Sequence, residues 1–346
     1  MKRKLKVAIL YNETMEDIRE VEAGQGEAIP FMDKSLPTPD EEFKAIARAL
    51  KRSGYSAEIF NIEDDLDRFF GFLDGYKPDA VFNLIEIFKF LPQLESHVAG
   101  FYHLLKIPYT GSSPLVLSNC QNKILVKRVL KSNGINTANF YVAEKPVTLK
   151  VTGLSLPLIL KPAFEDASVG IENASVVRDK DKFGPRLKYM LKRFKQPIII
   201  EEFIEGRELN VAIFGYPHLR ALPISEIDFT AMPDHLENIV SYEAKWDENH
   251  ESYHKTVPVC PSVLPLKTER KAKEIAVRAG KLMGITDYAR VDMRLREDGE
   301  LFVLEVNPNP DLTEGAGFMR SAHAAGYSLS QALDLIVKLA LRKKFA

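Results

Sequence analysis

The segment RVDMRLREDGELFVLEVN, residues 290–307, constrains the fold more than any other part of the chain. It reads as two alternating strands joined at Asp298-Gly299, a dipeptide favoured in two-residue hairpin turns. Apolar residues then face one another across the hairpin: Leu295 and Phe302, Met293 and Leu304, Val291 and Val306. A slip by one residue would move every side chain to the other face. We therefore predict an antiparallel hairpin with Leu304 and Val306 on its apolar face.

The other face of this hairpin carries polar side chains. The same register sets Asp292 opposite Glu305 and Arg290 opposite Asn307. Like charges directly opposite one another destabilise a sheet, so a cation is expected between the two acids. Carboxylate and amide oxygens are hard ligands that suit Mg²⁺ or Mn²⁺ better than Zn²⁺. We predict that Asp292, Glu305 and Asn307 bind metal; the alternative is that both acids lie on a solvated face of the sheet.

The composition excludes several classes of protein. The chain has 346 residues and 45% hydrophobic content, enough for two or three domains with a core each. A net charge of −1, with acidic and basic residues intermixed, argues against nucleic-acid or membrane binding. Cys120 and Cys260 lie far apart, which disfavours a disulfide or a thiolate zinc site. No apolar run suits a signal peptide or a membrane span, so we expect a cytoplasmic protein.

Strands and helices alternate in the first third of the chain. Strands are predicted over residues 5–12, 57–63, 80–88 and 107–112, and helices over 40–54 and 92–106. This alternation is typical of a parallel sheet covered by helices. We assign residues 1–112 to a Rossmann-like α/β domain. Its polar stretch from residue 13 to 40 is long for a connection, and such loops are often functional.

The remainder indicates two units that mix α and β structure. The central one, residues 113–204, contains predicted helices over 118–134 and 180–194 and strands over 139–144, 157–163, 172–178 and 197–203. The C-terminal one, residues 205–346, contains strands over 208–215 and 219–229, a helix over 267–284, the metal hairpin and a helix over 328–345. A Ser328/Gln331 capping box opens that last helix.

Two strand ends carry residues that suit a nucleotide. Lys161 closes the strand PLILKP before the small-residue segment FEDASVGI, where an ammonium and backbone N–H groups can bind phosphate together. The alternative is a snorkelling strand-end lysine. In IIIEEFIEGREL, Glu201 and Glu202 end a strand before Phe203 and Ile204, a mix that suits a base pocket. Strand-end glutamates are also often simply solvated.

Two further motifs lie in a polar loop. Lys245 in YEAKW reaches a phosphate if this loop folds over a site. HESYH, residues 250–254, matches the HExxH zinc motif, which requires a helix so that both histidines share one face. Its surroundings are polar and run into prolines, so a metallopeptidase is only a minor alternative.

The order of these pieces resembles the ATP-grasp enzymes, most closely the D-alanine–D-alanine ligase group. The resemblance runs from about Ala80 to the C-terminus, on IPYTGS, QNKILVK, LKPAFEDASVGI, EEFIEGRELNVAIFG, YEAKW, ARVDMRL and LEVNPNPDLT. It implies an ATP-grasp fold after a Rossmann-like pre-ATP-grasp domain, with ATP and two Mg²⁺ or Mn²⁺ ions. It also implies an amide formed from a small-molecule carboxylate and an amine through an acyl-phosphate, with release of ADP and phosphate. A homodimer is a further expectation from the resemblance.

The resemblance also implies a role for each matching residue. In chain order these are phosphate contacts by Lys123 and Lys161; the catalytic loop serine, Ser168; adenine contacts by Glu201, Glu202 and Ile204, with Phe203 as an apolar neighbour; a ribose contact by Glu208; a catalytic γ-phosphate contact by Lys245; stabilisation of the acyl-phosphate and tetrahedral intermediate by Arg290; and metal binding by Asp292, Glu305 and Asn307.

Some stretches depart from that group. YNETMEDIREVEAG and NLIEIFKFLPQLES lack the Ser/Glu loop and the His-Gly loop that meet the first amino acid. Asp311 and Ala316 stand where the group has a glycine and a serine. D-Alanine is therefore not implied as either substrate. The alternatives are an ATP-grasp kinase that phosphorylates an alcohol and a nucleotide-binding module without turnover; Arg290 and the NPNP segment favour the ligase.

Overall fold

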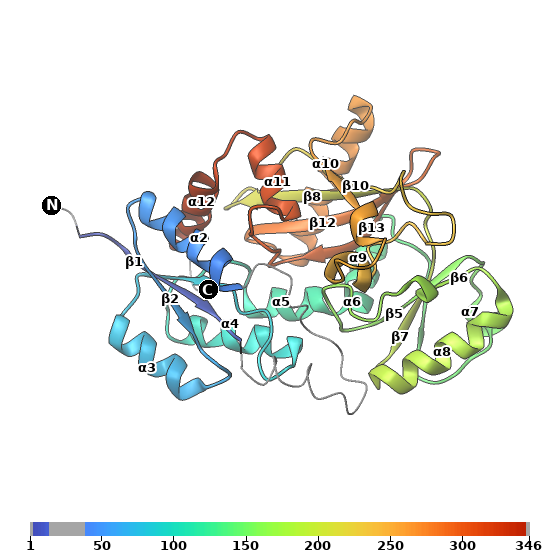
Figure 1. The fold of residues 1–346 in the computed structure, drawn as a ribbon, viewed down its shortest axis with the longest axis horizontal. Coiled ribbons are helices and arrows are strands. Elements are labelled where there is room, and N and C mark those ends of the chain that lie inside the picture. Colours follow the sequence, from blue (N-terminus) through green and yellow to red (C-terminus); the bar gives the residue numbers. More distant parts are fainter. Residues whose placement is uncertain (1–2, 14–38, 344–346) are drawn as a thin grey trace.

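The part of the chain that the structure describes contains three β-sheets, and helices pack against them (Figure 1). The structure is a computed structural model that describes residues 3–13 and 39–343. Most of the long polar stretch before residue 40, including most of YNETMEDIREVEAG, lies outside these residues. Within the described ranges, no helix combines the length and the apolar character needed to cross a bilayer.

The N-terminal sheet is parallel, as predicted, with the strand order β2-β1-β3. Its elements are β1 (Lys6–Tyr11), α2 (Pro39–Arg52), β2 (Ser56–Asn61), α3 (Leu66–Tyr76), β3 (Ala80–Asn83), η1 (Pro92–Leu94) and α4 (Glu95–Leu104). The predicted strand over 80–88 ends early, and that over 107–112 contributes only the bridge from Tyr109 to Val81. Helix α3 was not predicted; Asp65 caps it by accepting from two backbone N–H groups of the first turn.

The predicted helix over 118–134 is in fact two helices, α5 (Pro114–Gln121) and α6 (Lys123–Ser132). Asn122 separates them because its backbone is extended, with φ −80° and ψ 90°. Its side chain accepts from the Leu125 N–H at 3.0 Å, which caps α6. Because of this break, α6 begins at Lys123, the first residue predicted to contact phosphate, beside the end of β5.

The second sheet is antiparallel, with the order β4-β7-β5-β6. Its elements are β4 (Phe140–Ala143), α7 (Leu149–Thr152), β5 (Leu158–Pro162), η2 (Asn173–Ser175), β6 (Val176–Val177), α8 (Lys180–Phe194) and β7 (Ile198–Glu202). Phe183, Leu187 and Met190 form one buried stripe of α8, at helical spacing, against the sheet. The strand predicted over 172–178 shrinks to β6, because η2 occupies its first half.

The third sheet has six strands in the order β11-β10-β8-β12-β13, with β9 beside β8. Its elements are β8 (Arg207–Gly215), β9 (Arg220–Ala221), β10 (Ser225–Asp228), α9 (Tyr242–Trp246), η3 (Tyr253–Lys255), β11 (Val257–Val259), α10 (Leu266–Met283), β12 (Asp287–Leu295), β13 (Leu301–Asn307), α11 (Gly317–Ala324) and α12 (Leu329–Arg342). The strand predicted over 219–229 is divided into β9 and β10. The Ser328/Gln331 capping box is confirmed.

The hairpin of β12 and β13 differs from its predicted turn. The loop holds three residues, 297–299, closed by the Arg296 N–H donating to Glu300 O at 2.9 Å. Gly299 has a φ of +84°, which suits the last position of a three-residue hairpin loop. The longer loop shifts the pairing by one residue, so Met293 faces Val303 and not Leu304.

A bulge then corrects that shift. Leu304 is the extra residue between the pair Met293–Val303 and the pair Asp292–Glu305. Val303 and Val306 are therefore both buried, while Leu304 is only partly buried, so the prediction that Leu304 shares the apolar face is wrong. Beyond the bulge the predicted register is confirmed, including Arg290 opposite Asn307.

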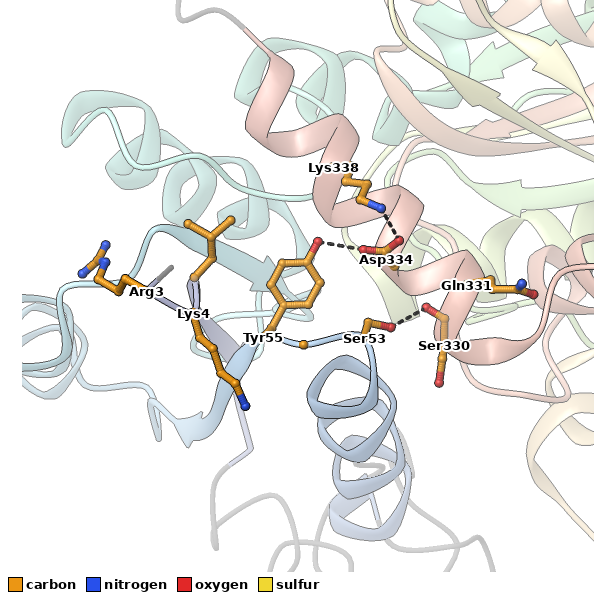
Figure 2. A pocket seen from close by; sticks show the side chains of 10 residues that line it. Arg3, Lys4, Ser53, Tyr55, Ser330, Gln331, Asp334 and Lys338 are labelled. Atoms are coloured by element: carbon orange, nitrogen blue, oxygen red, sulfur yellow. Dashed lines mark hydrogen bonds and ion pairs between the residues drawn. The ribbon is translucent and has the colours of Figure 1, made fainter. Parts of the chain in front are cut away.

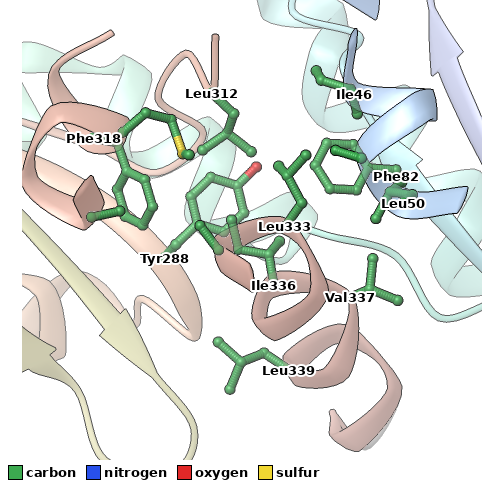
Figure 3. Packing of buried hydrophobic residues seen from close by; sticks show 14 of the residues in the cluster. Ile46, Leu50, Phe82, Tyr288, Leu312, Phe318, Leu333, Ile336, Val337 and Leu339 are labelled. Atoms are coloured by element: carbon green, nitrogen blue, oxygen red, sulfur yellow. The ribbon is translucent and has the colours of Figure 1, made fainter. Parts of the chain in front are cut away.

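Helix α12 joins the first and third sheets through one apolar core. Figure 3 shows Leu333 and Ile336 of α12 between Ile46 of α2 and Tyr288 of β12. These side chains are at most 2% exposed. The C-terminal helix therefore holds the N-terminal sheet against the sheet that carries the metal hairpin.

Polar contacts continue this junction at the surface. The Tyr55 hydroxyl donates to Asp334 at 2.8 Å, and Ser53 donates to the Ser330 carbonyl at 3.1 Å (Figure 2). They line a shallow cavity of about 440 Å³. Among the described residues that line it, none belongs to the predicted site.

Candidate functional site

Asp292 lies at the centre of the polar face of the third sheet. Its carboxylate accepts from Arg290 Nε at 2.8 Å and Nη2 at 2.7 Å, a bidentate pair. Asn210 on β8 donates to it at 2.8 Å and Asn307 on β13 at 2.9 Å. Asn307 also donates to Glu305 at 3.1 Å. The structure thus brings together all three predicted metal ligands and the predicted catalytic arginine.

Opposite charge surrounds the two carboxylates. Burial by itself would raise the pKa of Glu305, but Lys123, Arg290, the Asn307 amide and Lys161 together lower it to about 2. Glu305 is therefore ionised throughout the neutral range. Lys123 lies on α6 and Lys161 on β5, whereas Glu305 lies on β13. The charged groups of the site therefore come from α6 and from both the second and the third sheet.

The donor set suits a hard cation that also binds phosphate. Within residues 3–13 and 39–343, no three histidine, cysteine or carboxylate side chains converge to hold an ion. The hairpin offers two carboxylates and one amide, which leaves most of an octahedral shell to water and phosphate oxygens. Mg²⁺ is typically bound in this way, so the residues fit magnesium.

The lysines predicted for phosphate lie near the C-terminal end of β5. Lys161 on β5 places its Nζ 3.4 Å from Glu201 Oε2. Lys123, at the start of α6, donates to the Glu165 carbonyl and lies 3.4 Å from Asp166. Both lysines therefore lie next to the small-residue loop that follows β5.

The hinge between β7 and β8 holds the residues predicted for adenine. Glu201 and Glu202 point to opposite faces of β7, as strand geometry requires. Glu201 is buried, whereas Glu202 accepts from Asn139 at 2.9 Å and from the Ser155 N–H at 3.2 Å. The Glu202 side chain is thus on the face away from Glu201, which leaves only its backbone for the predicted adenine contact.

The predicted ribose residue has a buried partner. Glu208 Oε2 lies 2.8 Å from Arg294 Nη2, across the β8–β12 pairing. Arg294 also donates to Gly206 O at 3.0 Å, and its guanidinium lies 5.5 Å from the Phe203 ring centroid. Arg294 therefore ties the ribose candidate to the hinge.

Two segments beside the site are bonded to each other. Ser168 donates to the Val240 carbonyl at 2.9 Å, and Trp246 Nε1 donates to the Ala167 carbonyl at 3.0 Å. Ala167 and Ser168 have φ values of 52° and 64°, an unusual left-handed pair. We name residues 165–170 the serine loop, and it forms one cover with α9.

Lys245 on α9 belongs to the same charge cluster. Burial and the nearby Arg290 lower the pKa of Lys245, and the carboxylates of Glu86, Asp311 and Glu305 act against them. Glu86 lies in the stretch NLIEIFKFLPQLES, which departs from the ligase pattern. The structure therefore adds two carboxylates, those of Glu86 and Asp311, to the surroundings of the predicted γ-phosphate lysine.

The HESYH motif does not form a zinc site of the HExxH kind. Its residues lie in turns and in η3, and His254 Nε2 donates to the Glu248 carbonyl at 2.8 Å. His250 instead contacts Ser252 at 2.6 Å. The shared helical face that the motif requires is missing.

Besides Glu86 and Asp311, three residues at the site were not predicted from the sequence. Lys127 lies one helical turn after Lys123, and Asn210 and Arg294 lie two residues after Glu208 and Asp292 on their strands. Residues four apart on a helix and two apart on a strand point to the same face. Looking for polar residues at these spacings from the predicted ones would have found all three.

Comparisons with known proteins agree with this geometry. A model of the family described as "D-ala D-ala ligase C-terminus" matches residues 129–338. A D-alanine–D-alanine ligase of Bordetella petrii is 32% identical over 70% of this chain and 71% of its own length. One from Aquifex aeolicus is 29% identical over 85% of this chain and 92% of its own.

Solved structures extend the likeness to nearly the whole chain. The D-alanine–D-alanine ligase from Bacillus anthracis, complexed with ATP, superposes with a TM-score of 0.72 over 98% of both chains at 22% identity. The one from Coxiella burnetii gives 0.70 over 98% of this chain and 94% of its own, at 18% identity. The multidomain ATP-grasp fold implied by the sequence resemblance is thereby confirmed.

Proposed function

Because the chain belongs to the D-alanine–D-alanine ligase family, we propose that its hairpin carboxylates and strand-end lysines form the ATP site of a carboxylate–amine ligase. Membership of this family makes the chain an ATP-dependent enzyme that forms C–N bonds. The observation that carries the assignment of the site is the pairing of Asp292 with Glu305 beside Asn307 and Arg290.

The first step is transfer of the γ-phosphoryl group of ATP to a substrate carboxylate. Lys123 neutralises phosphate oxygens from α6, Lys161 does so from β5, and Lys245 does so from α9. Asp292, Glu305 and Asn307 would hold magnesium, which would supply further neutralisation of phosphate charge. Fixed positive groups of this kind stabilise the charge that spreads over the oxygens in the transition state.

The second step forms the amide. The amine nitrogen attacks the acyl carbon, a tetrahedral oxyanion forms, and its collapse breaks the bond to phosphate as the nitrogen loses a proton. Arg290 stabilises that oxyanion, because Asp292 holds its guanidinium in place through two hydrogen bonds. The serine loop and α9 keep water from the acyl-phosphate, which would otherwise hydrolyse.

The substrates are small amino-acid-like molecules. Asp311 places negative charge near Lys245 and Arg290, and Glu86, whose pKa burial raises to about 7, is partly ionised at neutral pH, so basic amino acids and diamines belong among the candidates beside D-alanine. A homodimer in solution is proposed from the family resemblance, and light scattering measures it directly.

The test is release of ADP and phosphate from ATP with Mg²⁺, across D- and L-amino acids and diamines, singly and in pairs. Mass spectrometry identifies the products. An amide formed together with ADP and phosphate supports the ligase and identifies its substrates. A phosphorylated alcohol with ADP would instead make the chain a kinase and remove the second step.

A further inference from the structure

Lys127 is a charged residue buried behind the adenine hinge, and the proposed reaction does not use it. Its side chain is 1% exposed. The Nζ atom donates to Thr137 Oγ1 at 2.8 Å and lies 3.2 Å from Glu201 Oε2. A buried ammonium is tolerated only where such partners compensate for lost water. The Lys127 ammonium therefore contacts Glu201 and Thr137 inside the protein and is shielded from solvent.

The Glu201 carboxylate is held on one side only. Its Oε2 atom faces both Lys127, at 3.2 Å, and Lys161, at 3.4 Å. Its Oε1 atom is buried and has no hydrogen-bond partner among residues 3–13 and 39–343. Burial opposes ionisation, yet Lys127 and Lys161 hold the pKa of Glu201 below its ordinary value. An ionised carboxylate only accepts hydrogen bonds, so Oε1 is an acceptor left open at the hinge.

The two lysines that contact Glu201 differ in burial, and so in whether their side chains can turn away from it. Lys161 is partly exposed at the strand end, where the proposed site has it bind phosphate. Lys127 is fully buried and bonded to Thr137. Once Lys161 turns toward a nucleotide, Lys127 is the partner that still holds Oε2, and so the orientation of Glu201 depends on it.

A fixed acceptor distinguishes purine bases. Adenine presents an exocyclic amino group, a donor, where guanine presents a carbonyl oxygen, an acceptor. We propose that Lys127 is a positioning residue that sets the nucleobase preference, by fixing Glu201 so that Oε1 accepts from the amino group of adenine and repels the carbonyl of guanine. This inference rests on the proposed nucleotide site and adds to it a residue that selects the base.

The experiment titrates Mg-ATP and Mg-GTP into the full chain and its Lys127→Met variant. Trp246 is the single tryptophan and lies on α9 beside the site, so its fluorescence reports binding. We expect the ratio of the GTP to the ATP dissociation constant to fall at least tenfold in Lys127→Met, chiefly through weaker ATP binding. Lys188→Met, the same substitution at an exposed position of α8, should keep the wild-type ratio.

A second variant covers loss of folding. If Lys127→Met does not fold, Thr137→Val keeps the volume and removes the hydroxyl that holds the ammonium, and we expect about a threefold fall in the ratio. A wild-type ratio in every folded variant of this pair would overturn the inference. Nucleotide binding needs no amide product, so this failure is distinct from the wild type binding ATP and forming no amide, which would overturn the proposed ligase site.

Discussion

Asp292 lies directly opposite Glu305, although the loop that joins their strands is one residue longer than a two-residue turn. The extra residue in the loop and the bulge at Leu304 offset each other, so the two carboxylates still face one another. A hairpin with only one of these two features would turn Glu305 into the apolar core. The position of the charges is thus determined by two irregularities together.

Removing one carboxylate should abolish turnover. Glu305→Gln keeps the shape of the side chain and removes its charge, so we expect ATP-dependent phosphate release to fall by at least about 100-fold. The fold should persist, as circular dichroism would show. Glu300→Gln, at an exposed residue of the same hairpin, is the matched control and should retain activity. Full activity of Glu305→Gln would remove the metal assignment.

Arg294 should contribute to both stability and nucleotide affinity. Arg294→Met leaves Glu208, whose side chain is only 13% exposed, without its ion-pair partner, which costs about 3 kcal/mol in the free energy of unfolding. ATP binding should weaken as well, because the ribose contact loses its orientation. Arg296→Met, two residues along the chain and exposed, should leave the urea midpoint unchanged. Equal midpoints for both variants would show that the Arg294 pair contributes no stability.

Asp287 should make stability depend on pH. Burial raises the pKa of Asp287 to about 6, although Lys343 and the Gly111 N–H act against it. The folded state therefore holds the proton more tightly than the unfolded chain, whose pKa is near 3.8. This stabilisation is complete below about pH 4 and is lost as the pH rises through 6. Relative to Asp287→Asn, the wild type should lose about 3 kcal/mol between pH 4 and pH 7 in urea unfolding. A difference that grows with pH would contradict this prediction.

Gly206 should tolerate no side chain. Its φ is +138°, and a Cβ atom there would lie 2.1 Å from the Leu295 carbonyl oxygen. Gly206→Ala should lower the free energy of unfolding by about 2 kcal/mol or more, since backbone must move. Gly71→Ala, in the middle of α3 with open space around it, should raise it by about 0.5–1 kcal/mol. Thermal unfolding compares the two, and equal melting temperatures would contradict the prediction.

Local signals explain what the sequence predicted well. The capping box at Ser328 follows from side chains three residues apart. The predicted pairing of Arg290 with Asn307 is right only because the longer loop and the bulge offset each other. Helix α3 escaped prediction because Gly71 and Gly75 weaken its helical signal, and its buried face needs Phe101 and Tyr102 from α4.

Tertiary contacts explain the remaining differences. Nothing within QNKILVK distinguishes a buried Lys127 from an exposed lysine, because its partners Thr137 and Glu201 come from other elements. Leu304 likewise continues an unbroken alternation in the sequence. Its bulge exists because the longer loop and the burial of Val303 shift the strand.

The hydrogen bonds between the serine loop and α9 impose an order of events. Ala167 is bonded to Trp246, Ser168 to the Val240 carbonyl, and the Tyr242 N–H to Ile171 O at 2.7 Å. Because these bonds join the two segments, we expect the segments to open together and ADP and product to leave only when they do. We therefore expect product release, and not bond formation, to limit the rate of the cycle.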